Sequence, residues 1–443
     1  MSKNDYLITE KPFKALLIFA LPIIIGNLFQ QAYNIVDSAV VGHFVSEEAL
    51  AAVGACSALT FIFIGVANGG GIGASVIVSR HFGEKNMKAL KTAFYTAFFS
   101  FLVLSLALAA IGLLGGRALM LFLNTPENII DMVMVYLNIY FLGLPFLFMY
   151  NVIASMFNAL GRSRIPLYFL IFSSIFNIVL DVLLVTRADL GIAGVAWATL
   201  IAQGLSALLS FLVLIRDIHK LCPERVSLFS FSEMKEMARV ALPSILQQLT
   251  ISVGMLFVQA VVNSFGSQVL AGFSAASRIE NVCIVPMVSV CNALSSYTAQ
   301  NLGAGRPERV PEGLRAALLL DGIFAVLWIV LCETCADPMA SVFMDASSSA
   351  VAYGTATFYI HVIGFFFMLI GIKMAFDGIL RGSGDVKMFT IANLANLALR
   401  LILSYSLGPT LGMTIIVAAV PMGWLVNGLI SGWEYRTGRW RRI

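Results

Sequence analysis

Residues 165–186, IPLYFLIFSSIFNIVLDVLLVT, form an apolar run with a single charged residue, Asp181. At about 1.5 Å per helical residue, such a run crosses a hydrocarbon core of about 30 Å. Similar runs recur along the chain, which is 59% hydrophobic and 12% charged with a mean hydropathy of +0.90. Because soluble domains carry about 25% charged residues, the composition predicts an integral membrane protein.

The apolar runs divide the chain into twelve predicted transmembrane helices, whose ends are set to within about 2–4 residues. The predicted spans are 14–40, 48–79, 92–115, 129–157, 165–186, 190–215, 237–265, 268–299, 313–336, 350–379, 388–407 and 411–434. The fold class is therefore an all-α membrane protein. No segment outside the spans is long enough to fold alone.

The distribution of Lys and Arg predicts the orientation, because these residues favour cytoplasmic loops. They gather before the first span, in every second connection and in the tail YRTGRWRR, whereas the other connections hold only Arg117 and Arg187. We therefore expect a multi-pass protein of the cell membrane with both termini in the cytoplasm. The net charge of +4 then reflects topology, and no nucleic-acid partner is expected. The long first span lacks a small-residue cleavage site and is expected to stay in the mature protein.

The chain repeats itself after about 220 residues. The tripeptide ALP at 20–22 recurs at 241–243, and Asn177 falls opposite Asn396 in the same alignment. An even number of spans in each repeat predicts two six-helix lobes related by a pseudo-two-fold axis along the membrane normal. The predicted division is 1–215 for the N-terminal lobe, 216–236 for a cytoplasmic linker and 237–443 for the C-terminal lobe.

The order of several motifs resembles that of the multidrug and toxic compound extrusion (MATE) transporters over essentially the full chain. These motifs are the LP of the first span, NIVDSAVVGHF, FNALGRSR, FNIVLD, AASRIE, NLGAGRPERV and ILRGSGD. The resemblance implies export of organic, often cationic, drugs by alternating access, coupled to H⁺ or Na⁺ and without a further cofactor. It also implies a transporter, not an enzyme.

Two acids inside apolar runs, Asp37 and Asp181, are the strongest functional signal, because burying a charge in a membrane is expensive. Asn177 lies one helical turn before Asp181, on the same helix face. The resemblance assigns Asp37, Asn177, Asp181 and Thr199 to a cation site. Two neighbouring carboxylates titrate as a pair and suit H⁺, whereas the four oxygen-bearing side chains also suit Na⁺. The alternative is a polar cluster that only fixes helix packing.

Other polar residues of the first half are candidates for lining a cavity or for anchoring helices to one another. They are Gln30, Gln31, Tyr33, Tyr136 and Asn151, the last suggested by the resemblance. Pro22, four turns before Asp37, is a candidate hinge whose bending the resemblance ties to protonation; the alternative is a static kink. GVANGGGIG, from Gly65, lacks the Lys and the strand of a phosphate loop and predicts close helix packing.

Charged residues also occur in spans of the second half. They are Arg278, Glu280, Lys373, Asp377 and Arg400. Lys373 and Asp377 are four residues apart, which predicts an ion pair on one helix face. Arg400 falls opposite Asp181, and a fixed guanidinium argues against a mirrored cation site. Cys332 and Cys335, in CETC, leave a disulfide or metal contact open, although buried packing is the simpler interpretation.

These observations predict a monomeric antiporter that exports amphipathic organic cations in exchange for H⁺ or Na⁺, with the lipid bilayer as its other partner. The related alternative is a flippase for lipid-linked or phosphate-bearing amphiphiles, which the basic residues of the second half leave open. A membrane-embedded enzyme is disfavoured, because the spans contain no HExxH or GxSxG motif and the four histidines are scattered.

Overall fold

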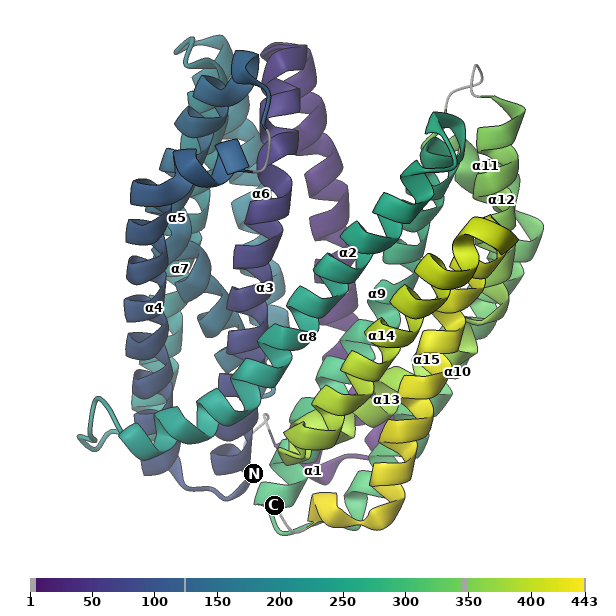
Figure 1. The fold of residues 1–443 in the computed structure, drawn as a ribbon. Helices are drawn as coiled ribbons and strands as arrows, with labels where there is room; N and C mark the ends of the chain where they lie inside the picture. The colour runs from purple at the N-terminus through teal and green to yellow at the C-terminus, as the bar shows by residue number, and fades with distance from the viewer. Residues whose placement is uncertain (1–4, 123–124, 345–348, 442–443) are drawn as a thin grey trace. The chain divides into compact units, whose positions relative to one another are not determined.

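The computed structural model describes residues 5–122, 125–344 and 349–441, with side chains at all positions except 38, 39, 42–44, 47, 50 and 58. Throughout these residues the regular elements are helices (Figure 1). They are α1 Tyr6–Thr9, α2 Pro12–Phe44, α3 Glu47–Gly83, α4 Met87–Phe122, α5 Glu127–Ala159, α6 Arg164–Thr186, α7 Gly191–Leu221, α8 Phe231–Asn263, α9 Ser267–Gly303, α10 Arg309–Thr334, α11 Ala336–Ser341, α12 Ala350–Phe365, α13 Phe367–Ser383, α14 Val386–Leu411, α15 Met413–Thr437 and the 3₁₀ turn η1 Arg439–Arg441.

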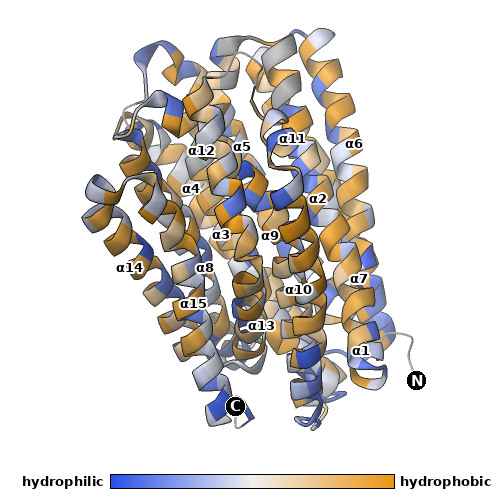
Figure 2. Ribbon diagram, turned by 90° about the vertical axis from the view of Figure 1, so that its right-hand side faces the viewer, coloured by the Kyte–Doolittle hydropathy of each residue, from blue (hydrophilic) through white to orange (hydrophobic). Residues whose placement is uncertain are grey.

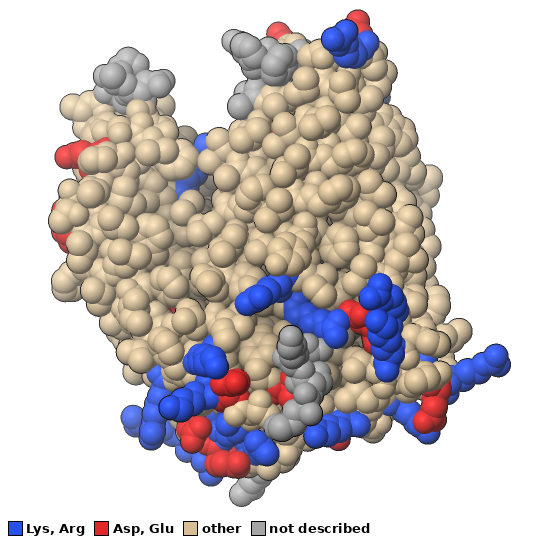
Figure 3. Space-filling model, turned by 180° about the vertical axis from the view of Figure 1, so that it is seen from behind, with Lys and Arg blue, Asp and Glu red and all other residues tan. Residues whose placement is uncertain are grey.

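The predicted all-α membrane fold is confirmed. Eleven of the described helices are each long and apolar enough to cross a membrane, and α12 with α13 supplies a twelfth span if the two count as one. Figure 2 shows helices that are mostly hydrophobic along their length, with hydrophilic residues concentrated near their ends. On the face seen in Figure 3, most Lys and Arg side chains lie in the lower part of the view.

The tenth predicted span, 350–379, is broken. Its two halves, α12 and α13, meet at Phe366 and are bent by 53°. The surrounding FFFM sequence contains no proline, so no local signal predicted the break. Gly364, just before it, packs so closely on Cys332 that a Cβ at this glycine would lie 2.5 Å from the Cys332 Cβ.

Several helices run beyond their apolar segments, because a helix keeps its backbone hydrogen bonds after it leaves the hydrocarbon. α7 continues to Leu221 and α8 already begins at Phe231, so only residues 222–230 of the predicted linker 216–236 are non-helical. Lys91 anchors this short connection, donating to the carbonyl oxygens of Cys222 at 2.9 Å and Glu224 at 2.7 Å.

The chain forms two compact units, one of Ile25–Ile245 and the other of Met1–Ile24 with Leu246–Ile443. In the first, α5 packs against α3, α4 and α7, and α6 packs against α7. In the second, α9 packs against α12 and α13, and α15 packs against α13 and α14. The lobe limits at residues 215 and 237 come from the sequence repeat, whereas the two units are defined by contacts between residues. The lobe limits therefore remain a prediction.

The two unit boundaries fall at equivalent places in the repeat. Each lies two residues after the proline of ALP, following Pro22 in α2 and Pro243 in α8. α2 and α8 therefore each contribute to both units, although both remain continuous helices through their prolines.

The glycine-rich segment of α3 packs closely, as its sequence predicted. A Cβ on Gly73 would lie 2.5 Å from the Cα of Ala241, and one on Gly69 would lie 2.6 Å from the Cα of Ile245. A Cβ on Gly70 would lie 2.2 Å from Cε1 of the Phe101 ring. These glycines allow α3 to approach the first part of α8 and also α4.

Candidate functional site

The four residues of the predicted cation site come together in the unit Ile25–Ile245. Asp37 lies on α2, Asn177 and Asp181 lie one turn apart on α6, and Thr199 lies on α7. The α6 residues point into the unit, since Asn177 is 2% exposed and Asp181 is fully buried. The other residues from Ile175 to Leu184 are aliphatic or aromatic, and they are half-buried or exposed.

A chain of hydrogen bonds links these helices. The Tyr33 hydroxyl on α2 donates to Asn177 Oδ1, and Asn177 Nδ2 donates to Thr199 Oγ1 at 3.4 Å. The Thr199 hydroxyl donates in turn to the carbonyl oxygen of Val195 at 3.1 Å. Tyr33, predicted as a cavity residue, is thus part of the site itself.

The two carboxyl groups are direct neighbours. The Asp37 carboxyl group lies within hydrogen-bonding reach of the side chains of Asp181 and Tyr33. A hydrogen bond between two carboxyl groups requires a proton on one of them, because two carboxylates offer only acceptors. The pair can therefore hold one proton in a setting that disfavours two full charges.

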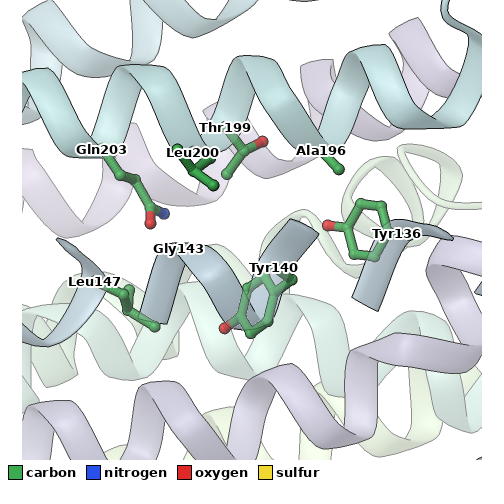
Figure 4. Close-up of a pocket in the computed structure, with 8 residues that line it drawn as sticks. All are labelled: Tyr136, Tyr140, Gly143, Leu147, Ala196, Thr199, Leu200 and Gln203. Carbon is green, nitrogen blue, oxygen red and sulfur yellow. The ribbon is translucent and has the colours of Figure 1, made fainter. Parts of the chain in front are cut away.

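A small, narrow pocket adjoins this site (Figure 4). Its walls are one face of α5 and one face of α7, at helical spacing. The lining residues are Tyr136, Tyr140, Gly143, Leu147, Ala196, Thr199, Leu200 and Gln203. Thr199 belongs to both the pocket and the hydrogen-bond chain, so the two are in direct contact. Tyr136 lines the pocket as predicted and interacts electrostatically with both aspartates.

The other predicted cavity residues lie elsewhere. Gln30 donates to Asn34 Oδ1 at 3.1 Å, and neither Gln30 nor Gln31 lines this pocket. Asn151 donates to the carbonyl oxygen of Leu147 at 2.8 Å, one turn beyond the pocket wall. Sequence reasoning missed Tyr140 and Gln203, although the i, i+4 spacing of the two tyrosines on α5 was a usable signal.

Comparison with known proteins is consistent with this architecture. The MatE family model matches residues 22–183 and 243–406. The chain belongs to the MatE family. "Probable multidrug resistance protein YpnP" of Bacillus subtilis is 30% identical to this MatE chain over 97% of it and 96% of the relative. An "FAD transporter" of Shewanella oneidensis is 27% identical over 94% of this chain and 92% of the relative.

Solved structures share the fold of this MatE protein. An outward-facing multidrug resistance MATE transporter has a TM-score of 0.91 at 23% identity, covering 99% of this chain and 98% of that one. A MATE protein in the bent conformation has a TM-score of 0.91 at 22% identity, covering 100% and 99%. The relatives are named for multidrug resistance or FAD transport, which does not favour the predicted flippase alternative.

Two of the predicted charges in the second unit of this MatE protein form an ion pair. Lys373 Nζ and Asp377 Oδ2 lie 2.8 Å apart and both side chains are buried, which confirms the predicted ion pair. The Tyr359 hydroxyl donates to Glu280 Oε2 at 2.5 Å, and Arg278 is exposed on the same helix as Glu280. Glu280 and Asp377 thus have structural partners.

Sequence reasoning missed a further intramembrane acid, Asp321 of α10. It is 1% exposed, and neither carboxyl oxygen has a hydrogen-bond partner among the described residues. It packs against Gly371 of α13, where a Cβ would lie 3.0 Å from the Asp321 Cβ. The signal was the same as for Asp37: a lone acid within an apolar run, here AALLLDGIFAVL.

The cysteines are free in the described structure, and all but Cys335 are buried. The Cys332 thiol lies beside the Cys283 thiol of α9. The simpler interpretation of CETC, buried packing, therefore fits Cys332.

One acid outside the spans has a shifted pKa. Burial, and after it the neighbouring Glu434 carboxyl, raise the pKa of Asp385 from 3.8 to about 6. Asp385 lies in the turn between α13 and α14, and Glu434 lies near the end of α15.

Proposed function

We propose that this protein is a secondary active exporter of amphipathic organic cations, driven by inward H⁺ movement through Asp37 and Asp181. The multidrug resistance and export names of its relatives support the export role. The acids support a cationic substrate. An exporter that binds the coupling ion and the drug in turn needs a site that favours positive charge in both the ion-bound and the drug-bound state. The carboxyl pair is the observation on which the coupling rests.

The pattern of hydrogen bonds favours H⁺ over Na⁺ as the coupling ion. Na⁺ needs several oxygen ligands directed at one point. Here Asn177 Oδ1 accepts from Tyr33, and the Thr199 hydroxyl is engaged with Asn177 and Val195. The neighbouring carboxyl groups of Asp37 and Asp181, by contrast, can share one proton between them.

The same network offers a route from ion release to substrate binding. Loss of the shared proton leaves two adjacent carboxylates, which repel each other and attract a cation. Thr199 and Tyr136 connect this charge to the aromatic pocket, where a cationic amphiphile finds both an acid and aromatic faces. Protonation would then discharge the drug.

We place the termini in the cytoplasm on the basis of the Lys and Arg distribution, and we propose that the protein acts in the cell membrane as a monomer. Pro22 is proposed as a hinge, because the unit boundary lies two residues beyond it. Pro243 holds the equivalent position in α8 and is proposed as its counterpart.

The test is uptake of a fluorescent organic cation into everted vesicles, energised separately by a pH gradient and by a Na⁺ gradient. We expect uptake with the pH gradient alone, and its loss in Asp37→Asn and in Asp181→Asn. Glu333→Gln, which removes an exposed acid paired with His361, is the matched control and should transport normally. Uptake driven only by Na⁺, or undiminished in both aspartate variants, would refute the proposal.

A further inference from the structure

The short helix α1 owes its structure to the surface on which it lies. We call residues 5–10, which contain α1 and lead into α2, the first entry segment. A helix of one turn does not persist alone in water, because nucleating it costs more free energy than its few hydrogen bonds contribute. Leu7 is fully buried in a cluster with Leu294 of α9 and Val310 of α10, and Ile8 is 7% exposed. Contacts with α9 and α10 thus hold the first entry segment in place.

Three side chains at the end of α9 and the start of α10 bind the backbone of this segment. They are Asn301, Arg306 and Arg309, which donate to the carbonyl oxygens of Leu7 at 3.1 Å, Ile8 at 3.2 Å and Glu10 at 2.5 Å, respectively. The last carbonyl oxygens of a helix have no partner within it, so these donors satisfy groups that α1 leaves open. The turn between α9 and α10 is therefore a docking site for the chain that enters α2.

The chain that enters α8 is bound in a similar way. Residues 222–233 form the second entry segment, which packs on α3 and α4. Lys91 of α4 donates to the carbonyl oxygen of Cys222 at 2.9 Å, and the hydroxyl of Thr96 accepts the backbone N–H of Ser230 at 3.0 Å. This segment too is recognised through its backbone.

The two entry segments are bound at equivalent positions of the repeat. His81 and Asn301 each lie two residues before the glycine that ends α3 or α9. Asn301 binds the first entry segment, and His81 Nε2 lies 3.1 Å from Glu233 Oε2 in the second. The α3–α4 turn and the α9–α10 turn therefore each bind the segment that precedes the first long helix of the other repeat.

These contacts account for the division of the chain into its compact units. Residues up to Ile24 group with the second unit, and residues 222–245 group with the first. α2 therefore starts in the unit that binds its entry segment and continues in the other, and α8 does the same in the opposite sense. Each change of unit follows a proline, Pro22 or Pro243, where a helix lacks one hydrogen bond and bends readily.

We propose that transport requires both entry segments to stay docked, because they fix the start of α2 to the second unit and the start of α8 to the first. A movement of one unit relative to the other is then taken up by bending at Pro22 and Pro243. A released segment would leave the start of its helix free of this constraint. The consequence for transport rests on the proposed export function, whereas docking itself does not.

Docking of the first entry segment is tested by the reactivity of a buried thiol in purified protein. Ile8→Cys supplies the thiol, and Cys335→Ser removes the native cysteine that is not buried. Arg306→Ala should raise the rate of labelling by a thiol reagent about tenfold, since it removes one hydrogen bond from a charged donor. Arg315→Ala, which removes an exposed arginine of α10, is the matched control and should not change the rate.

Docking of the second entry segment is reported by the native Cys222, whose side chain is 4% exposed. Lys91→Met keeps the aliphatic stem of the side chain and removes the ammonium group that binds the Cys222 carbonyl oxygen. It should raise the labelling of Cys222 about tenfold, whereas Lys85→Met, which removes an exposed lysine of the α3–α4 turn, should not.

The requirement for docking in transport is tested by complete release of the first entry segment. Leu7→Asp places a charge at a fully buried position, so the segment should leave its site. The thiol of Ile8→Cys should then react as fast as in unfolded protein, and uptake of a fluorescent organic cation into everted vesicles should be lost. Arg306→Ala combined with Arg309→Ala takes the place of Leu7→Asp if that variant does not fold.

Labelling that Arg306→Ala and Lys91→Met leave unchanged, or full transport by a protein whose segment is released, would overturn the inference. Failure of the proposed function has a different signature, which is visible in the wild type. If the wild-type protein moves no organic cation, the proposed function is refuted, while the labelling rates still show whether both entry segments are docked.

Discussion

The buried ion pair of α13 makes a sharp prediction about stability. Asp377 is fully buried; its Oδ2 lies 2.8 Å from Lys373 Nζ, and its Oδ1 accepts from Ser431 at 3.0 Å. Asp377→Asn keeps the shape and the contact with Ser431 but leaves the Lys373 ammonium without a countercharge. Breaking a buried pair in this way costs about 3–5 kcal/mol.

Removing both charges should restore most of this loss. Lys373→Met combined with Asp377→Asn leaves no uncompensated charge, and replacing a buried pair by uncharged groups is often neutral or stabilising. Glu333→Gln breaks an exposed pair with His361 and should change stability by less than about 1 kcal/mol.

The assay is thermal unfolding in detergent, followed with a thiol-reactive fluorescent dye. It suits this protein because Cys283, Cys291 and Cys332 are free and buried in the same unit. We expect a clearly lower unfolding temperature for Asp377→Asn and recovery in the double variant. If Asp377→Asn unfolds at the same temperature as the wild type, or if the double variant unfolds at a lower temperature than the single variant, the pair does not stabilise the fold as argued.

Three further predictions concern other parts of the molecule. Because the pKa of Asp385 is raised from 3.8 to about 6, its stabilising contribution is present below about pH 4 and lost as the pH rises through 6. Between pH 5 and pH 7.5, the free energy of unfolding of the wild type should therefore fall by about 1.4 kcal/mol relative to that of Asp385→Asn; a pH-independent difference would contradict this. A cysteine at Ser46 should react with an impermeant thiol reagent from outside intact cells and one at Asn86 only after permeabilisation, and the reverse pattern would invert the topology. Gly73→Ala should lower the unfolding temperature, since its Cβ would lie 2.5 Å from backbone of α8, whereas Gly54→Ala, with no atom within 4 Å, should not; equal effects would refute the packing argument.

The sequence predicted the membrane fold well because the signals are local. An apolar run long enough to span the bilayer must be helical there, and all predicted spans appear. The repeat pairs the two ALP motifs, and each of their prolines precedes a unit boundary by two residues. The spacing of Lys373 and Asp377 likewise predicted their ion pair, since side chains four apart share a helix face.

What sequence reasoning could not predict depends on contacts between helices. The break at Phe366 has no proline or glycine pair at the bend itself, and the approach of Cys332 to Cys283 brings together residues far apart in the chain. The link from Tyr33 to Asn177 is also a contact between distant segments. Asp321 is different: its signal was present in the sequence and was overlooked.

The most direct test of the central claim, that Asp37 and Asp181 exchange a proton for the drug, is proton release on substrate binding. Addition of an organic cation to purified protein in weakly buffered detergent solution, monitored with a pH dye, should release protons from the wild type and from Glu280→Gln. Asp37→Asn and Asp181→Asn should release none while remaining folded by thermal unfolding. Undiminished release from both aspartate variants, or its loss only in Glu280→Gln, would place the coupling in the other unit and contradict this mechanism.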